Sequence, residues 1–312
     1  MRPRDSKRAK QLDQALADFD ANVRALPGIA TAQARACLID QILESIRRVR
    51  FVHTIRGRDI SRRRADPLDD MFDPVRAAVL HQLAGRTDEA FWLVFLFVHF
   101  GKHTPDGWRY LREVYGGGQT GAWTWARVSA DVAAFRADLN NRALHIRRKD
   151  VPGGFGGHRR YESLDAYSAH GTGAVVASYV AWVASGGGGH EQLFAAAQKG
   201  GNDPHQAFED LYCSLDAVTR FGRTARFDYL AMIGKLGLAN IEPGSPYLNG
   251  ATGPLRGARL LLDGNKHATE GVPSLEDSLK KWGSRLDIGM QVVEDSLCNW
   301  QKSPSEFKAF RG

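Results

Sequence analysis

Apolar residues recur every three to four positions along most of this chain, which is the period of an amphipathic α-helix. In the first such stretch, residues 9–26, Leu12, Leu16 and Phe19 fall on one helical face, and Pro27 ends the helix. Strict alternation of apolar and polar residues, the period of a strand, is scarce, so we expect no sheet of any size. The same analysis predicts helices over residues 31–50, 73–84, 89–100, 105–115, 131–139, 163–185, 191–199, 206–218, 227–238, 254–262 and 274–300. The sequence therefore predicts an all-α fold.

The predicted helices group into one large domain with a short segment at each end. We expect an N-terminal helix within residues 1–30, a helical domain over 31–302 and a tail over 303–312. Glycines interrupt the helical pattern after residue 185, so the large domain either is continuous or consists of two lobes that part near residues 186–205. With 312 residues, of which 43% are hydrophobic, the chain is long and apolar enough to bury a sizeable core.

Charge and cysteine content indicate the partner and the compartment. The formal net charge is +7, which favours an anionic partner, with nucleic acid first. Three cysteines lie far apart without metal-ligand spacing, so we expect reduced thiols in a cytoplasmic protein. The most apolar run, residues 91–100, is too short to span a bilayer, and the basic N-terminus lacks the apolar stretch of a signal peptide. We therefore expect no membrane partner, and nothing in the sequence indicates an oligomer.

Glycines and arginines follow the predicted helix at 227–238 in a pattern typical of a helix-hairpin-helix DNA-binding element. Gly250, Gly253 and Gly257 would let the backbone approach a phosphate, and the next helix would present its N-terminal N–H groups to that anion. Arg256 adds positive charge beside the hairpin. The usual hairpin has the spacing Gly-x-Gly, whereas this one has Gly-x-x-Gly, so a glycine-rich loop between two packed helices is the alternative.

Arginines are concentrated in residues 47–64, where eight of them surround one acid, Asp59. Guanidinium groups suit phosphate recognition, and Arg56 and Arg58 are the residues that we expect to contact DNA. Such a cluster releases counterions on binding, so the affinity should depend strongly on salt. In the alternative interpretation, Asp59 pairs with one arginine and holds a helix end.

A glycine-rich loop at residues 151–161 carries a second basic group. His158, Arg159 and Arg160 follow four glycines, so backbone N–H groups and cationic side chains could reach a phosphate together. Phe155 is placed to stack on a base. The alternative is a mobile surface loop without a function.

Other kinds of chemistry lack a sequence basis. His99 and His103 have metal-ligand spacing, but no third ligand accompanies them. The chain contains no Walker loop and no Gly-x-Ser-x-Gly nucleophile elbow. We therefore expect neither a metal nor a cofactor.

Several of these segments occur in an order that resembles a known family. The segments are residues 51–59, 91–97, 155–160, 250–257 and 293–298. Their order resembles the α-glutamyl/putrescinyl thymine pyrophosphorylase family, clade 3, over residues 47–302. The chain is also similar to the helical domain attached to 5-hydroxymethyl-deoxyuridine DNA kinases. These proteins are connected with hypermodified DNA bases and resemble helical DNA glycosylases.

The resemblance implies a fold and an activity. The fold would be that of a DNA glycosylase, with a helix-hairpin-helix element near residues 227–262. The enzyme would excise a hypermodified pyrimidine, α-glucosyl-5-hydroxymethylcytosine, from double-stranded phage DNA and leave abasic sites, as an anti-phage defence in the bacterial cytoplasm. The family name implies instead a transferase that builds a modified base on pyrophosphorylated hydroxymethyl-pyrimidine DNA. A non-catalytic reader of modified DNA is the third hypothesis.

A glycosylase needs an ionised carboxylate beside the anomeric carbon, because positive charge develops on the sugar as the base leaves. The candidates are Asp59, Asp228, Asp263 and Glu294. Asp59 has the best sequence case, because it lies in the arginine segment that carries the family resemblance, and Asp263 follows the hairpin helix more closely than the catalytic aspartate of typical helix-hairpin-helix glycosylases does. No lysine lies within the hairpin, which favours water over an amine as the nucleophile. Lys235 and Lys266 keep a lyase activity open. The base pocket would include Phe51, Phe155 and Tyr229.

Overall fold

The fold is helical throughout the part that a computed structural model describes, residues 3–148, 150, 153–198 and 203–309. No strand occurs among these residues, and their one extended pairing is an isolated antiparallel bridge between His103 and Gly107. This confirms the predicted all-α class. The chain divides into two compact units, which we call unit 1 (Met1–His53 with Pro243–Arg311) and unit 2 (Thr54–Glu242).

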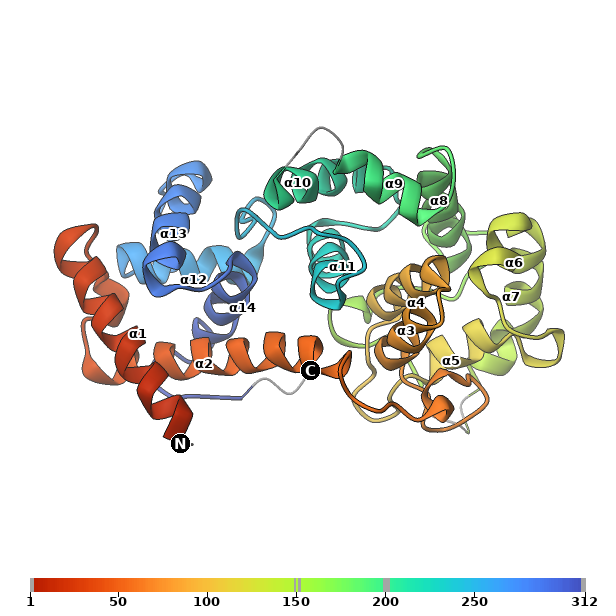
Figure 1. The fold of residues 1–312 in the computed structure, drawn as a ribbon, viewed down its shortest axis with the longest axis horizontal. Coiled ribbons are helices and arrows are strands. Elements are labelled where there is room, and N and C mark those ends of the chain that lie inside the picture. Colours follow the sequence, from red (N-terminus) through yellow and green to blue (C-terminus); the bar gives the residue numbers. More distant parts are fainter. Residues whose placement is uncertain (1–2, 149, 151–152, 199–202, 310–312) are drawn as a thin grey trace. The chain divides into compact units, whose positions relative to one another are not determined.

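Unit 1 is a bundle of helices from the two ends of the chain. Its core is formed by side chains such as Leu16, Phe19, Leu261, Trp282 and Trp300, each fully buried. The N-terminal helix packs against α13. The helices of this unit, coloured red and blue in Figure 1, are α1 (Pro3–Asn22), most of α2 (Ala32–Ile55), α12 (Thr252–Asp263), α13 (Val272–Leu286) and α14 (Met290–Trp300), with the 3-10 helix η1 (Pro27–Ile29).

Close packing of α12 on α14 explains two of the glycines that the sequence assigned to a DNA-binding hairpin. A Cβ atom on Gly257 would lie 2.4 Å from the backbone oxygen of Leu297, and one on Gly253 would lie 2.6 Å from Cys298 Sγ. Both glycines point at α14, and spaced four apart they form one smooth face that lets the two helices approach. Gly253 and Gly257 therefore serve helix packing within unit 1.

The helices that the hairpin would join belong to different units. Helix α11 (Arg223–Leu236) belongs to unit 2, α12 belongs to unit 1, and residues 237–251 form an irregular connection between them. Gly250 has a positive φ of 73° within this connection. The helix-hairpin-helix element is thus not confirmed.

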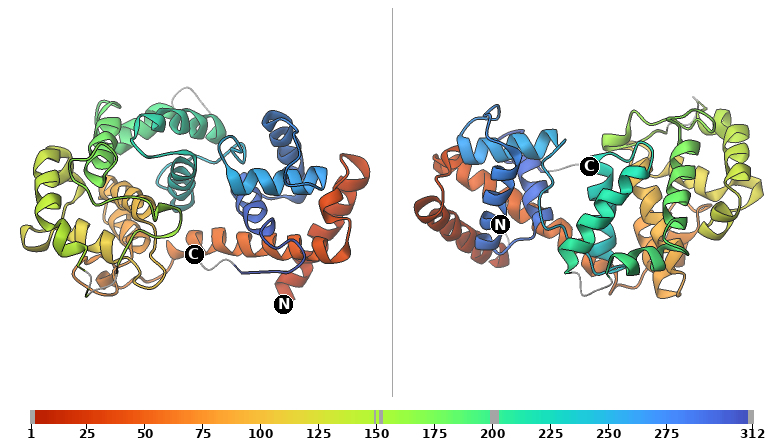
Figure 2. Two further views of the ribbon diagram at one scale, coloured as in Figure 1. Left: turned by 180° about the vertical axis from the view of Figure 1, so that it is seen from behind. Right: turned by 90° about the horizontal axis from the view of Figure 1, so that it is seen from above.

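Unit 2 is built around one apolar helix, α4 (Thr87–Phe100), whose buried residues include Phe91, Trp92 and Phe95. Helices α3, α5, α6, α9 and α11 all pack on it, as the two views of Figure 2 allow the reader to follow. The other helices are α3 (Pro74–Leu83), α5 (Arg109–Gly116), α6 (Trp125–Ala130), α7 (Val132–Ile146), α8 (Thr172–Ala184), α9 (His190–Ala197), α10 (Pro204–Ser214) and α11. Short 3-10 helices occur at η2 (Arg62–Ala65), η3 (Gly118–Thr120), η4 (Gly157–Arg159) and η5 (Leu215–Ala217).

Capping residues fix several of these helix starts. The Asp73 side chain accepts a hydrogen bond from the Arg76 N–H at 2.9 Å, and Pro74 supplies the φ of a first helical turn. The Asp131 side chain accepts one from the Ala134 N–H at 2.8 Å and begins α7 in the same way. Both starts agree with the sequence prediction.

Candidate active site

Asp228 lies on the outward face of α11, opposite the side that Phe227, Tyr229 and Ile233 bury in the core. Solvent reaches its side chain, yet enough protein surrounds the carboxyl group that desolvation raises its pKa. Among the described residues the Asp228 carboxylate accepts no hydrogen bond and forms no ion pair. An acid that is partly desolvated but lacks a fixed partner is typical of functional sites rather than of structural ones.

Four cationic side chains act on this carboxylate, and each lowers its pKa against the effect of desolvation: Arg159, Lys235, Arg223 and His158, in decreasing order. Arg223 and Lys235 lie on α11 itself, whereas His158 and Arg159 come from η4, far away in sequence. We call these five residues the Asp228 cluster. The cluster thus combines one carboxylate with cationic side chains from two segments that lie far apart in sequence.

Arg159 is held in an unusual way for a surface arginine. Its Nε donates to the Val98 carbonyl oxygen at 3.1 Å, and its guanidinium lies 6.0 Å from the centre of the Phe221 ring. Its Nη2 atom is buried and has no hydrogen-bond partner among the described residues. Desolvation lowers the pKa of Arg159, although Asp228 and Glu162 act in the opposite direction. A buried cationic donor without a partner is poised to bind an anion or a carbonyl oxygen.

Arg220, in the turn before α11, is a further arginine near this site that the sequence analysis missed. Arg220 forms an ion pair with Glu162, at 3.1 Å between Nη2 and Oε1, and its own backbone has a positive φ of 61°. A non-glycine residue in the left-handed region costs about 1–3 kcal/mol, and such strained residues cluster at active sites. The signal in the sequence was Arg220-Phe221-Gly222-Arg223 directly before a helix, a basic helix start like the one noted at residues 157–160.

The glycine-rich loop is anchored on the end of α4. The Gly156 N–H donates to the Phe100 carbonyl oxygen at 2.9 Å, and a Cβ atom on Gly156 would lie 1.9 Å from the backbone oxygen of Lys102. Phe155 is only 8% exposed and stacks on Phe100, with ring centroids 5.2 Å apart. Phe155 therefore fixes the loop that presents His158 and Arg159, and its role in a base pocket stays a prediction.

Tyr229 is likewise buried, and fully so. Its hydroxyl lies 2.9 Å from the hydroxyl of Tyr179, which lies 2.7 Å from His190 Nε2, and His190 Nδ1 lies 2.8 Å from an Asp88 carboxylate oxygen. Asp88 requires a proton on Nδ1, so His190 Nε2 accepts from Tyr179 and Tyr179 accepts from Tyr229. This chain of hydrogen bonds joins α4, α8, α9 and α11 and gives Tyr229 a structural position.

The arginine-rich segment is exposed. Asp59 follows the end of α2 and has no ion pair among the described residues. The nearby Arg63 pairs with Asp69, at 2.6 Å between Nε and Oδ2. Arg58 and Phe51 are exposed as well, although Phe51 belongs to unit 1. The Arg56 guanidinium lies against Gly237, at the end of the helix that carries Asp228. Arg160 is also exposed, with its guanidinium 4.8 Å from the ring of Tyr161.

The remaining predicted residues lie in unit 1. Glu294 is half-buried on α14, and Arg256 is exposed on α12. Asp263 accepts a hydrogen bond from Arg24 Nη2 at 2.9 Å, and the same guanidinium also binds Glu270, so Asp263 holds a structural ion-pair network. Lys266 donates to the Gln301 carbonyl oxygen. The structure thus brings together Asp228, His158 and Arg159, and leaves Asp59 and Glu294 outside that cluster.

The two histidines with metal-ligand spacing have other partners. His99 is buried beside Thr172, with 3.0 Å between Nε2 and Oγ1, and burial lowers the pKa of His99 to about 3. His103 Nδ1 lies 2.6 Å from an Asp106 carboxylate oxygen. In the described part of the chain, no group of three or more His, Cys, Asp or Glu side chains could hold a metal ion. None of the described helices has the length and apolar character needed to cross a membrane.

These features define an all-α protein with a cationic site built around one carboxylate. Residues 33–312 match the family model for alpha-glutamyl/putrescinyl thymine pyrophosphorylase clade 3, and the chain belongs to this family. The family is a pyrophosphorylase clade connected with DNA modification, which fits the processing of modified bases in DNA and makes DNA a plausible partner. Neither a curated protein nor a solved structure matched the chain.

Proposed function

We propose that the protein is a DNA glycosylase that excises a hypermodified pyrimidine, α-glucosyl-5-hydroxymethylcytosine, from phage DNA in the bacterial cytoplasm. The observation that carries the proposal is the Asp228 carboxyl group, desolvated and without a fixed partner, among the cations of the Asp228 cluster. The family membership supports a modified base in DNA as the substrate.

Hydrolysis needs one carboxylate and one water. As the N-glycosidic bond breaks, its electron pair leaves with the base, and positive charge spreads over C1′ and the ring oxygen of the deoxyribose. Ionised Asp228 would stabilise that charge and position a water on the open face of C1′. The water oxygen becomes the C1′ hydroxyl, one of its protons neutralises the departing base, and the product is an abasic site.

Cationic residues around Asp228 would hold the DNA backbone on either side of the extruded nucleotide. Extrusion costs a few kcal/mol, and phosphate contacts help to offset that cost. Arg160 offers an exposed guanidinium beside Tyr161, which is 74% exposed and could stack on an unpaired base, and Arg159 adds positive charge beneath the surface. The exposed Arg56 and Arg58 would extend the phosphate contacts along the same unit.

Incubation with phage DNA that carries glucosylated hydroxymethylcytosine should produce abasic sites, and unmodified DNA should produce none. The sites are counted with an aldehyde-reactive probe, in the absence of any co-substrate. Strand breaks should appear only after heat or alkali, because water rather than a lysine is the expected nucleophile. Covalent trapping of the protein on DNA by borohydride would contradict that expectation and implicate Lys235, the lysine of the cluster.

The rate of excision should rise with pH across the titration of Asp228. Desolvation raises the pKa of this carboxyl group, and only the ionised form stabilises the cationic sugar, so activity appears as the pH passes upward through the raised value. The acidic limb of the kcat/KM profile should therefore lie above the pKa of an ordinary aspartate, about 3.9. An unchanged rate below that pH would contradict the assignment.

A transferase is the second candidate function, because the family name describes a pyrophosphorylase. In that reaction a pyrophosphate leaves a hydroxymethyl-pyrimidine in DNA while a nucleophile replaces it, and the arginines and lysine of the Asp228 cluster would bind the leaving group. The abasic-site experiment separates the hypotheses. A transferase needs an activated base and a donor and leaves the N-glycosidic bond intact, whereas a non-catalytic reader only binds.

A further inference from the structure

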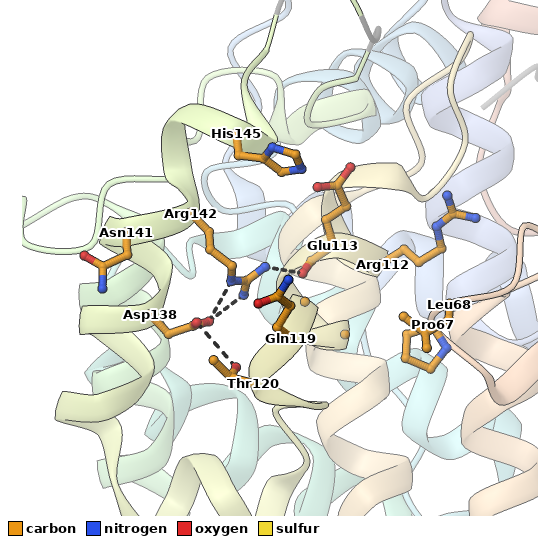
Figure 3. A pocket seen from close by; sticks show the side chains of 12 residues that line it. Pro67, Leu68, Arg112, Glu113, Gln119, Thr120, Asp138, Asn141, Arg142 and His145 are labelled. Atoms are coloured by element: carbon orange, nitrogen blue, oxygen red, sulfur yellow. Dashed lines mark hydrogen bonds and ion pairs between the residues drawn. The ribbon is translucent and has the colours of Figure 1, made fainter.

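A polar cavity lies within unit 2 and shares no residue with the Asp228 cluster. Its volume is about 590 Å³, and α5, η3 and α7 form most of its wall. Pro67 and Leu68 supply an apolar edge on one side, as Figure 3 shows. Its polar lining includes Arg112, Glu113, Gln119, Asp138, Asn141 and Arg142.

The charged groups on the α7 side neutralise one another. Arg142 binds Asp138, at 2.5 Å between Nη2 and Oδ2, and its Nη1 donates to the Glu113 carbonyl oxygen at 2.8 Å. The Trp123 indole N–H donates to the same Asp138 oxygen at 2.7 Å. Arg142 holds the pKa of Asp138 below its usual value although burial acts in the opposite direction, so the pair stays ionised and matched.

The charged groups on the α5 side are matched as well. Glu113 Oε1 lies 3.0 Å from Arg109 Nε. Arg112 forms an ion pair with Asp70 and donates to the Asp69 carbonyl oxygen at 3.2 Å. Because every charge on the wall already has a partner of opposite sign, neither an anion nor a cation gains a free counter-charge here.

The groups that remain available are neutral amides. Gln119 and Asn141 are exposed at the cavity and form no side-chain hydrogen bond with the described residues, and Figure 3 shows Gln119 between Arg142 and Arg112. Each amide offers two donors and one acceptor oxygen, and Glu113 has a second carboxylate oxygen beyond the one that faces Arg109. Donors and acceptors thus alternate over a short distance. A hydroxyl group, which donates and accepts at one atom, satisfies such a wall best.

We propose that this cavity binds an uncharged, hydroxyl-rich ring, that is, one monosaccharide unit. A nucleobase fits less well, because the ring of His145, the aromatic side chain among the lining residues, already lies against Arg148, at 2.7 Å between Nε2 and Nη1, whereas Pro67 and Leu68 suit the C–H groups of a sugar ring. The volume lies within the range of small-molecule sites. The sugar is either a free monosaccharide or a glycosyl group carried by a DNA base, and only the second source rests on the proposed glycosylase function.

Glucose titrated into the full-length ¹⁵N-labelled protein should shift amide resonances of α5, η3 and α7, with a Kd of about 1 mM, which corresponds to about −4 kcal/mol. Gln119→Ala and Asn141→Ala should each weaken this binding about tenfold. Asn140→Ala is the matched control: Asn140 is exposed on the same helix, does not line the cavity, and should leave the affinity unchanged. Deoxycytidine binding in place of glucose, equal affinity in all variants, or no glucose binding would overturn the proposal.

Competition identifies the source of the sugar. If a glucosylated oligonucleotide displaces glucose and an unmodified one does not, the cavity reads a DNA-borne sugar. If neither displaces it, the ligand is a free monosaccharide. The readout is binding without excision, so loss of the glycosylase proposal would leave this result standing, and loss of glucose binding would leave the abasic-site result standing.

Discussion

Asp228→Asn should largely abolish base excision, with kcat reduced about 10²–10³-fold, the range found when one preorganised electrostatic group is removed from an active site. Asparagine keeps the shape of the side chain and removes its negative charge, so the cationic sugar loses its stabilisation while the DNA-binding surface remains. The expected pattern is a collapse of excision in single-turnover assays with unchanged affinity for modified DNA.

The same substitution should not destabilise the protein. The pKa of Asp228 in the folded state is raised above its unfolded value, so its contribution to stability is fully present only below the unfolded pKa and is lost as the pH rises through the folded pKa. At neutral pH the ionised group is therefore a cost to folding, and Asp228→Asn should leave Tm unchanged or raise it. A gain in Tm together with a loss of activity separates a catalytic acid from a structural one.

Matched carboxylate variants rank the other candidates. Asp59→Asn and Glu294→Gln remove charge from residues outside the Asp228 cluster, and Asp216→Asn removes one from an exposed ion pair with Arg226. All three should retain excision. If Asp228→Asn excises at the ordinary rate while Asp59→Asn or Glu294→Gln does not, the catalytic role belongs to that other carboxylate.

Helix class and several helix starts followed from local rules. Asp73 with Pro74 and Asp131 begin helices where the sequence predicted, because a cap and its first turn are neighbours along the chain. The predicted helix at 274–300 is two helices instead, α13 and α14, because Asp287 takes a left-handed φ of 53° between them. Apolar periodicity continues through that break, so the pattern alone could not reveal it.

The candidate site depended on contacts that no local pattern contains. Asp228, His158 and Arg159 were each noted in the sequence, but their grouping requires the glycine loop to be anchored on α4 and α11 to pack on α4. Phe155 and Tyr229 show a limit of local patterns. The sequence predicts both aromatic side chains as base contacts because they lie in candidate functional segments, whereas in the structure both are buried.

Gly257→Ala should destabilise unit 1 by about 2–3 kcal/mol, although alanine is the better helix former by about 1 kcal/mol. The sign of this change in stability decides between two interpretations of Gly253 and Gly257. If Gly257 served a DNA phosphate at a free helix start, the alanine variant would be more stable and would bind DNA more weakly. A Cβ atom at this position lies 2.4 Å from the Leu297 backbone oxygen, so α12 and α14 must move apart.

Thermal unfolding of the full chain, followed by circular dichroism, measures this effect, and a loss of 2–3 kcal/mol corresponds to a decrease in Tm of roughly 10 °C for a unit of this size. Arg256→Ala is the control, because Arg256 is exposed on the same helix and has a similar helix propensity to alanine. Its Tm should stay within about 1–2 °C of the parent, as for most surface substitutions. A stabilised Gly257→Ala variant would show that α12 and α14 do not depend on this close approach, and would return the glycines to a role in binding.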